Sequence, residues 1–93
     1  MKVAFSTRAI QDYESLADPD RAKVDRLIEA IAEHPFEGIG KPEPLKGPLA
    51  GWWSRRITIQ HRLVYRINGS GDDRRLDVAA CRTHYEGIDT GRT

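Results

Sequence analysis

The sequence predicts an α+β domain in which a helical hairpin packs on one face of an antiparallel sheet. Three observations support this fold class. The first third of the chain holds a short strand-like run and two stretches with helical periodicity, a segment rich in proline and glycine follows, and the remainder reads as three strands. The predicted order is strand, helix, helix, strand, strand, strand, and the sheet face away from the helices is expected to be open. Ninety-three residues are enough for one domain with a single modest core.

The N-terminal part reads as scaffold. Residues 3–6 read as a short first strand, and Ser6 is suited to cap a first helix whose apolar residues recur at helical spacing through Ala17. Asp18, followed by a proline, predicts the N-cap of a second helix. This helix should end just before Pro35, because the residue before a proline avoids the helical conformation. We assign no catalytic role to the two helices.

The second half of the chain supplies most of the predicted sheet. Residues 35–51 contain four of the five prolines and four of the eight glycines, so this segment should be extended and irregular. Strands are expected at 52–58, 62–67 and 76–85. Residues 68–73 are small and polar and should form the turn between the last two strands.

Composition bounds the class of protein. Hydrophobic residues make up 39% of the chain and charged residues 31%, which is typical of a globular domain. No apolar run is long enough to span a bilayer, so we expect no membrane association. A single cysteine cannot form an internal disulfide, which favours the reducing cytoplasm. One cysteine and three scattered histidines do not make a structural zinc site, and no metal or cofactor is expected.

The charges are unevenly distributed along the chain. Residues 1–40 carry five basic and eight acidic side chains, a net charge of −3, whereas residues 41–85 carry nine and four, a net charge of +5. Residues 86–93 carry a net charge of −1, which gives +1 for the whole chain. The basic second segment favours a polyanionic ligand such as nucleic acid. Chance variation over short segments is the alternative explanation.

Two residues of the basic segment are suited to proton transfer in RNA cleavage, which requires a base for the 2′-hydroxyl and an acid for the departing oxygen. Glu43 lies between Pro42 and Pro44, which restrict the backbone around its carboxylate. His84 lies near the end of the last predicted strand and has an unperturbed pKa of about 6.5. The alternative for Glu43 is an ordinary exposed loop residue.

Several cations are candidates for stabilising a phosphate. Arg62 begins a predicted strand and points to the open face by alternation, and its planar guanidinium can donate two parallel hydrogen bonds to phosphate. Arg55 and Arg56 are neighbours on a strand, so at most one of them can enter a given site. Lys41 and Lys46 would add positive charge. Strand arginines that only keep a sheet edge soluble are the alternative.

The aromatic residues and the cysteine allow more than one role. Tyr85 can stack on an unpaired base or contact a phosphate, but strict alternation places it on the opposite face from His84. Trp52 and Trp53 should divide between the core and a rim or partner-facing position. Cys81 lies in an apolar strand and is expected to be a buried thiol.

Five motifs, in the same order and spacing from Met1 to Tyr85, resemble the YoeB/Txe toxins of the RelE superfamily of type II toxin–antitoxin systems. The motifs are PFEG (35–38), GKPEPLK (40–46), GWWSRRI (51–57), HRLVY (61–65) and AACRTHY (79–85). The resemblance implies that residues 1–85 form a single RelE/YoeB-like toxin domain. Residues 86–93 extend beyond the usual end of this family and are expected to form a disordered tail.

The resemblance also implies an activity: ribosome-dependent, metal-independent mRNA cleavage by 2′-hydroxyl attack. It implies roles for six residues: Glu43 as general base, His84 as general acid, Arg62 as transition-state cation, Tyr85 completing the site, and Lys46 and Arg56 as supporting cations. The implied partners are a YefM/Axe-like antitoxin, the ribosome and mRNA, and a homodimer is left open. Gln60 departs from the family, in which relatives commonly carry a glutamate before the His-Arg pair. The loss of that carboxylate is expected to alter how Arg62 is oriented.

Two other functions remain possible at this point. A non-catalytic toxin of the RelE/ParE fold would act by binding a protein target, although such members lack the set of Glu, Arg, His and Tyr. A plain RNA-binding module would show affinity that falls with salt and no cleavage.

Overall fold

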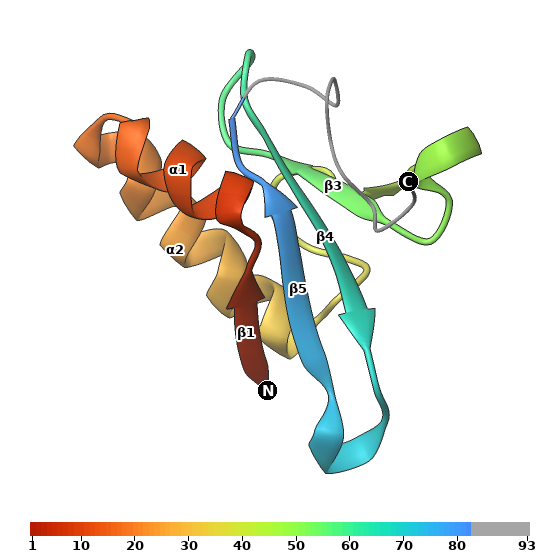
Figure 1. Cartoon of the computed structure of the whole chain (residues 1–93). Helices are drawn as coiled ribbons and strands as arrows, with labels where there is room; N and C mark the ends of the chain where they lie inside the picture. Colours follow the sequence, from red (N-terminus) through yellow and green to blue (C-terminus); the bar gives the residue numbers. More distant parts are fainter. Residues whose placement is uncertain (83–93) are drawn as a thin grey trace.

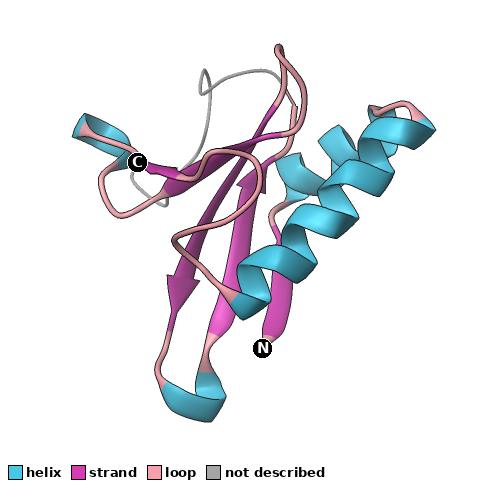
Figure 2. Ribbon diagram, turned by 180° about the vertical axis from the view of Figure 1, so that it is seen from behind, coloured by secondary structure: helices cyan, strands magenta, loops and turns pink. Residues whose placement is uncertain are grey.

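The structure is a computed structural model that describes residues 1–82, and it contains two helices and a mixed five-stranded sheet (Figure 1). The elements in chain order are β1 (Lys2–Phe5), α1 (Thr7–Ser15), α2 (Asp18–Glu33), β2 (Glu43–Pro44), the 3₁₀ turn η1 (Gly47–Leu49), β3 (Trp53–Arg56), β4 (Arg62–Asn68), the 3₁₀ turn η2 (Gly71–Asp73) and β5 (Arg75–Ala80). The predicted α+β class is confirmed, with both helices on one face of the sheet (Figure 2).

The sheet has the strand order β1-β5-β4-β3-β2, so β1 and β2 are its edges. The strands β2 to β5 pair in antiparallel fashion, whereas β1 runs parallel to β5. The sheet is therefore mixed rather than wholly antiparallel. The two helices between β1 and the rest of the chain make this parallel pairing possible, because parallel strands need a long crossover.

Some predicted boundaries were wrong. Strand β3 is shorter than the predicted 52–58, and β5 ends at Ala80 rather than continuing to residue 85. One strand was not expected: β2 has only two residues, and it lies in the segment predicted to be irregular. Residues 83–85 of the predicted last strand lie outside the described part of the chain.

The helix ends follow the sequence with one exception. Ser6 caps α1 as predicted, because its hydroxyl oxygen accepts a hydrogen bond from the amide of Ala9 at 3.0 Å. Asp18 was predicted to cap α2, but Ala17 occupies the N-cap position and Asp18 is the first helical residue. Its carboxylate accepts a hydrogen bond from Arg21 instead, on the next turn of the helix.

Two apolar clusters lie on opposite faces of the sheet. The larger lies under the helices and contains Ala9, Leu16, Val24, Leu27, Ile31, Ile57, Leu63, Tyr65, Leu76, Val78 and Cys81. The smaller contains Trp52, Val64, Ala79 and Ala80, with Leu45 packed against it. The face without helices, called the open face below, is therefore partly covered by its own side chains. Within residues 1–82, no helix is long and apolar enough to cross a bilayer.

An irregularity in β5 builds the smaller cluster. Tyr65 of β4 pairs with Val78, and its neighbour Val64 pairs with Ala80, so Ala79 is an extra residue on β5. Such a bulge breaks the alternation of side chains between the two faces. Ala79 and Ala80 accordingly belong to the same cluster.

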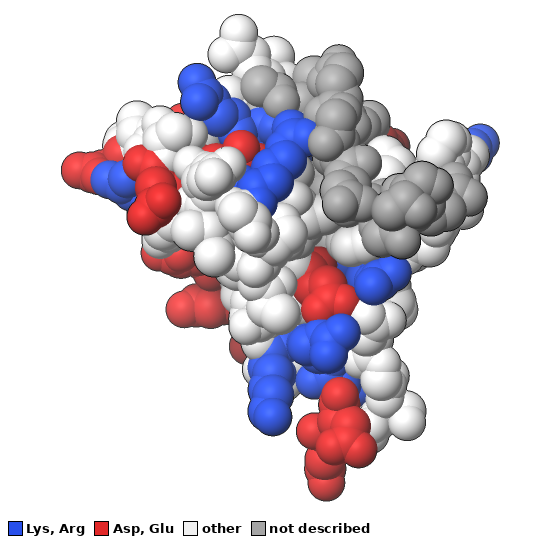
Figure 3. Space-filling view, in the orientation of Figure 1, with Lys and Arg blue, Asp and Glu red and all other residues white. Residues whose placement is uncertain are grey.

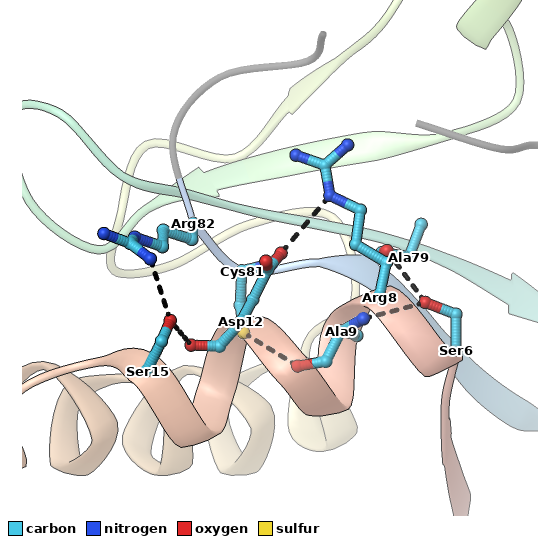
Figure 4. A network of polar contacts seen from close by, with 8 residues as sticks. All are labelled: Ser6, Arg8, Ala9, Asp12, Ser15, Ala79, Cys81 and Arg82. Atoms are coloured by element: carbon cyan, nitrogen blue, oxygen red, sulfur yellow. Dashed lines mark hydrogen bonds and ion pairs between the residues drawn. The ribbon is translucent and has the colours of Figure 1, made fainter. Parts of the chain in front are cut away.

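Helix α1 fixes the end of β5 through polar contacts (Figure 4). The Oδ2 atom of Asp12 accepts a hydrogen bond from the amide of Cys81 at 3.1 Å and lies 3.5 Å from Nε of Arg8. The guanidinium of Arg82 donates to Oγ of Ser15 at 3.1 Å. The chain therefore leaves the sheet at a defined place, just before the segment that carries His84 and Tyr85.

Candidate active site

The strand register places Glu43 on the open face. Glu43 on β2 pairs with Ser54 on β3, and Ser54 pairs with Val64 on β4. Residues directly opposite each other in a sheet share a face. Because Val64 belongs to the cluster on the open face, the exposed side chain of Glu43 also projects from that face.

A row of arginines lies next to Glu43 on the same face. Arg56 is two residues beyond Ser54 on β3, and it pairs with Arg62 on β4. Strands lie about 4.8 Å apart and two residues span about 6.8 Å along a strand, so the Cα atoms of Glu43 and Arg62 are separated by about 12 Å. The side chains of Glu43, Arg56 and Arg62 can therefore reach a phosphodiester placed between them.

The guanidinium of Arg62 is bound to the turn between β3 and β4. Its Nη1 atom donates to the carbonyl oxygens of Thr58 at 2.8 Å, Ile59 at 2.9 Å and His61 at 3.2 Å. Gln60 lies exposed on this turn, and its amide donates to the hydroxyl of Thr58 at 3.2 Å. Backbone carbonyls of this turn thus orient Arg62.

The expectation that Arg55 contacts RNA is corrected by its position. Its side chain faces the helices and is fully buried, whereas its neighbour Arg56 is exposed on the open face. The prediction that the two arginines face opposite sides of the strand is therefore confirmed. Arg55 instead donates hydrogen bonds to backbone carbonyls in the segment that follows α2.

The remaining predicted site residues lie at the margins. Lys41 and Lys46 are exposed on either side of β2, and Lys41 has a positive φ of 51°. Lys46 follows Leu45, whose amide donates to the carbonyl of Trp52 at 2.9 Å. The predicted acid His84 and its neighbour Tyr85 lie outside the described residues.

The two tryptophans, at and just before the start of β3, lie on opposite faces of the sheet. Trp52 is buried in the cluster on the open face, and the Cζ atom of Arg66 lies 4.5 Å from the centre of its ring. Trp53 is half-buried on the helix side, with its ring 4.7 Å from that of Phe36. As expected, one tryptophan belongs to a core and the other lies nearer the rim. Cys81 is buried as expected, and burial raises its pKa to about 12, so its thiol stays protonated near neutrality.

Sequence reasoning missed the role of Asp77 on the open face. Its carboxylate accepts hydrogen bonds from Arg75 at 2.6 Å, from Arg66 at 3.3 Å and from Asn68. These partners, with Arg75 the strongest, hold the pKa of Asp77 below its usual value. Arg75 and Asp77 are two residues apart on β5, so alternation alone could have paired them, whereas the register of β4 and β5 brings Arg66 and Asn68 to Asp77.

The open face is consequently not uniformly basic. In Figure 3, which has the orientation of Figure 1, Lys and Arg side chains lie beside Asp and Glu side chains on the surface. Two of the cations behind the +5 charge of residues 41–85 are paired with Asp77. Among residues 1–82, no group of three or more His, Cys, Asp or Glu side chains is placed to hold a metal ion.

Comparisons with known proteins bear on the whole domain. Residues 5–85 match the family model of the YoeB-like toxin of bacterial type II toxin–antitoxin systems. The chain is 48% identical over 89 residues to Toxin YoeB of Synechocystis, covering 92% of this chain and 99% of that protein. It is 47% identical over 88 residues to Toxin YoeB of Escherichia coli K12, covering 91% and 100%.

Solved structures agree with these sequence matches. A YoeB/ParE toxin from Agrobacterium tumefaciens superposes with a TM-score of 0.88 at 48% identity, covering 91% of this chain and 100% of that one. A YoeB toxin in a heterotetrameric YoeB–YefM complex from Staphylococcus aureus gives 0.78 at 37% identity, covering 91% and 98%. A chain of the RelBE2 toxin–antitoxin complex from Mycobacterium tuberculosis gives 0.70 at 25% identity, covering 89% and 96%. The chain therefore belongs to the YoeB-like toxins of bacterial type II toxin–antitoxin systems, within the RelE superfamily.

Proposed function

We propose that this toxin is an endoribonuclease that cleaves mRNA on the ribosome without a metal ion and thereby blocks translation. The observation that supports the proposal most directly is the strand register, which brings Glu43, Arg56 and Arg62 to one end of the open face. A carboxylate beside two guanidinium groups is the arrangement expected for attack on a phosphodiester, where a proton is removed and negative charge accumulates.

The proposed reaction is an internal transfer within the RNA. Glu43 takes the proton of the 2′-hydroxyl, and the 2′-oxygen forms a bond to the adjacent phosphorus. Arg62 and Arg56 stabilise the charge on the pentacoordinate phosphorus, with Lys46 and Lys41 adding positive field. The bond from phosphorus to the 5′-oxygen then breaks, and His84 donates a proton to that oxygen. The products are a 2′,3′-cyclic phosphate and a free 5′-hydroxyl.

The remaining assignment concerns the surroundings of the scissile bond. Tyr85 is proposed to complete the site by contacting the RNA through its ring or hydroxyl. The conformation of Arg62 in this structure is maintained by the carbonyls of the turn between β3 and β4. These contacts use Nη1, so a phosphate can approach the guanidinium from its other nitrogen atoms without dismantling the turn.

We propose that the partner protein is a YefM/Axe-like antitoxin. A YoeB protein of S. aureus has been solved with YefM, and this chain is 37% identical to it. An acidic segment of the antitoxin is expected to cover the open face and so to exclude RNA. A YoeB dimer from S. aureus makes a homodimer of this chain a further proposal.

Cleavage of mRNA in the presence of purified ribosomes tests the proposal. The parent should generate new fragments that end in 2′,3′-cyclic phosphate, and Glu43→Gln and His84→Ala should each slow cleavage by about 10²–10⁴-fold. Glu29→Gln is a matched control, because it makes the same change on an exposed position of α2 and should cleave like the parent.

Two outcomes would contradict the proposal in different ways. If the parent gives no new fragments and His84→Ala inhibits growth as strongly as the parent does, the toxin is not a nuclease. Binding to RNA that weakens with salt, without cleavage, would identify an RNA-binding module instead. An arrest of replication rather than translation would indicate a non-catalytic toxin that binds a protein target.

A further inference from the structure

Arg55 carries a positive charge into the core of the domain. Its side chain is 0% exposed, and it faces the helices rather than the open face where RNA is proposed to bind. We infer that Arg55 is a positioning residue that fixes the segment between α2 and β2 and so holds the carboxylate of Glu43 in place. The inference rests on the proposed function, in which Glu43 is the general base.

One guanidinium collects several carbonyl groups from this segment. The Nη2 atom of Arg55 donates to the carbonyl oxygens of His34 at 2.6 Å and Glu37 at 2.9 Å, and Nη1 donates to that of Ile39 at 3.1 Å. The segment 34–39, which has no helix or strand structure, is thereby attached to β3 through three of its carbonyl groups. A lysine ammonium has no planar fork and cannot reach three carbonyls in this arrangement.

Tyr65 completes the contacts from the neighbouring strand. Its hydroxyl accepts a hydrogen bond from Nε of Arg55 at 3.2 Å and donates to the carbonyl of Pro35 at 2.7 Å. Burial raises the pKa of Tyr65, and the nearby guanidinium partly opposes that change. The phenol therefore stays protonated and serves as a donor and an acceptor at once.

The location of the charge is favourable for the end of helix α2. This helix has no basic residue in its last turn, and His34, whose carbonyl receives the shortest of the three Arg55 contacts, is its C-cap. The C-terminal end of a helix carries partial negative charge, which a cation stabilises. Arg55 thus supplies from β3 the cation that α2 lacks, and the carbonyl dipoles replace the water lost by its guanidinium.

Gly40 transmits this arrangement to the active site. It has a φ of +83°, and a Cβ atom built on it would lie 2.9 Å from Cδ2 of Leu27 and 3.1 Å from Cβ of Arg55. Its carbonyl accepts a hydrogen bond from the amide of Arg56 at 2.6 Å. The chain therefore passes over Arg55 at a distance that only glycine allows and joins the edge of β3 at Arg56.

The short length of β2 makes this junction decisive for Glu43. β2 has two residues, so its position depends on the hydrogen bonds just before and just after it. The bond before it is that of Gly40 to Arg56, and the bond after it joins the amide of Leu45 to the carbonyl of Trp52 at 2.9 Å. Glu43 follows Gly40 by three residues, so loosening of the first bond should move the carboxylate directly.

Amide hydrogen exchange tests the structural part of the inference. Arg55→Lys and Gly40→Ala should each speed exchange of the Arg56 amide by about 10-fold or more, because both disturb the junction, whereas α1 amides should be unaffected. Arg26→Lys, the same change at an exposed position of α2, is the control and should leave the Arg56 amide as in the parent. Unchanged exchange in both test variants would overturn the inference.

A double-mutant cycle tests the functional part. In the parent background, Arg55→Lys should lower kcat for mRNA cleavage by about 10- to 100-fold with little change in KM, because the bound RNA meets a misplaced base. In the Glu43→Gln background the same change should have almost no further effect, since Arg55 acts through Glu43. An equal loss in both backgrounds would show general loosening of the fold and would overturn the positioning role.

The two tests separate the inference from the function on which it rests. If the parent protein does not cleave mRNA, the proposed function fails, and the catalytic role of Arg55 fails with it. The exchange experiment then still decides whether Arg55 fixes the segment before β2. Tyr65→Phe, which keeps the ring and removes one hydrogen-bonding hydroxyl, provides a milder variant should Arg55→Lys fold poorly, and it should change exchange in the same direction.

Discussion

Replacing Asp12 by alanine should destabilise the domain by removing the contact between α1 and the end of β5. The carboxylate accepts a hydrogen bond from the Cys81 amide at 3.1 Å and pairs with Arg8 at 3.5 Å, and the two paired side chains are 15% and 30% exposed. A hydrogen bond to a charged acceptor contributes about 1.5–3 kcal/mol, and a partly exposed ion pair contributes about 1 kcal/mol or less. Because both contacts involve the same oxygen, we expect a combined loss of about 2–3 kcal/mol.

Urea unfolding followed by circular dichroism measures this loss. At an unchanged m-value, the midpoint should fall for Asp12→Ala, and the melting temperature should fall by about 10–20 °C for a domain of this size. Asp12→Asn retains an acceptor oxygen and should lose about 1 kcal/mol. Glu14→Ala, at an exposed position on the same helix, should stay within about 0.5 kcal/mol of the parent.

Two results would refute this reasoning. The free energy of unfolding of Asp12→Ala could lie within about 0.5 kcal/mol of that of the parent, which would mean that the Cys81 amide finds another hydrogen-bond acceptor at no cost. Asp12→Asn could be as destabilising as alanine, which would show that charge rather than the acceptor oxygen is what α1 supplies to β5.

Three further predictions follow from other contacts. Arg75, Arg66 and Asn68 lower the pKa of Asp77, so its contribution to stability is present above the unfolded pKa of about 3.9 and is lost as pH falls through the folded value. Asp77→Asn should therefore reduce the loss of stability on acidification, measured by urea unfolding between about pH 5 and pH 2. Gly69→Ala should lower the free energy of unfolding by about 1–3 kcal/mol more than Gly47→Ala, measured by thermal unfolding. Both glycines have a positive φ, but only the Cβ at Gly69 would lie 2.5 Å from a backbone oxygen. Equal losses would contradict this reasoning. The native Cys81 thiol, with a pKa of about 12, should resist alkylation by iodoacetamide at pH 8 and react only on unfolding; rapid native labelling would show that the site is accessible.

The patterns within single elements predicted most of the fold. Ser6 caps α1, α2 ends before Pro35, and the alternation in β4 places Leu63 and Tyr65 under the helices and Val64 on the other face. These features depend on neighbours in sequence, which propensity and periodicity describe well. The exception among them, Asp18, shows that a favourable cap residue can be displaced by one position when its carboxylate pairs within the helix.

Features that depend on pairing between distant segments were not predictable. The parallel alignment of β1 with β5 and the bulge at Ala79 arise from tertiary packing, as does the pairing of Asp77 with Arg66. The same limit applies to the candidate site. Alternation showed that Arg55 and Arg56 face opposite ways, but only the position of the helices decided that Arg55 is the buried one.

The edge of the sheet beside Glu43 is poorly suited to pairing with a further β-strand. Strand β2 is an edge strand of two residues, and the prolines on both sides of Glu43 have no amide hydrogen to donate. A further β-strand, from another copy of the toxin or from a misfolded chain, would find few backbone amide donors there. Its approach would also have to remove water from the exposed carboxylate of Glu43. The rim is thereby protected from becoming a template for aggregation.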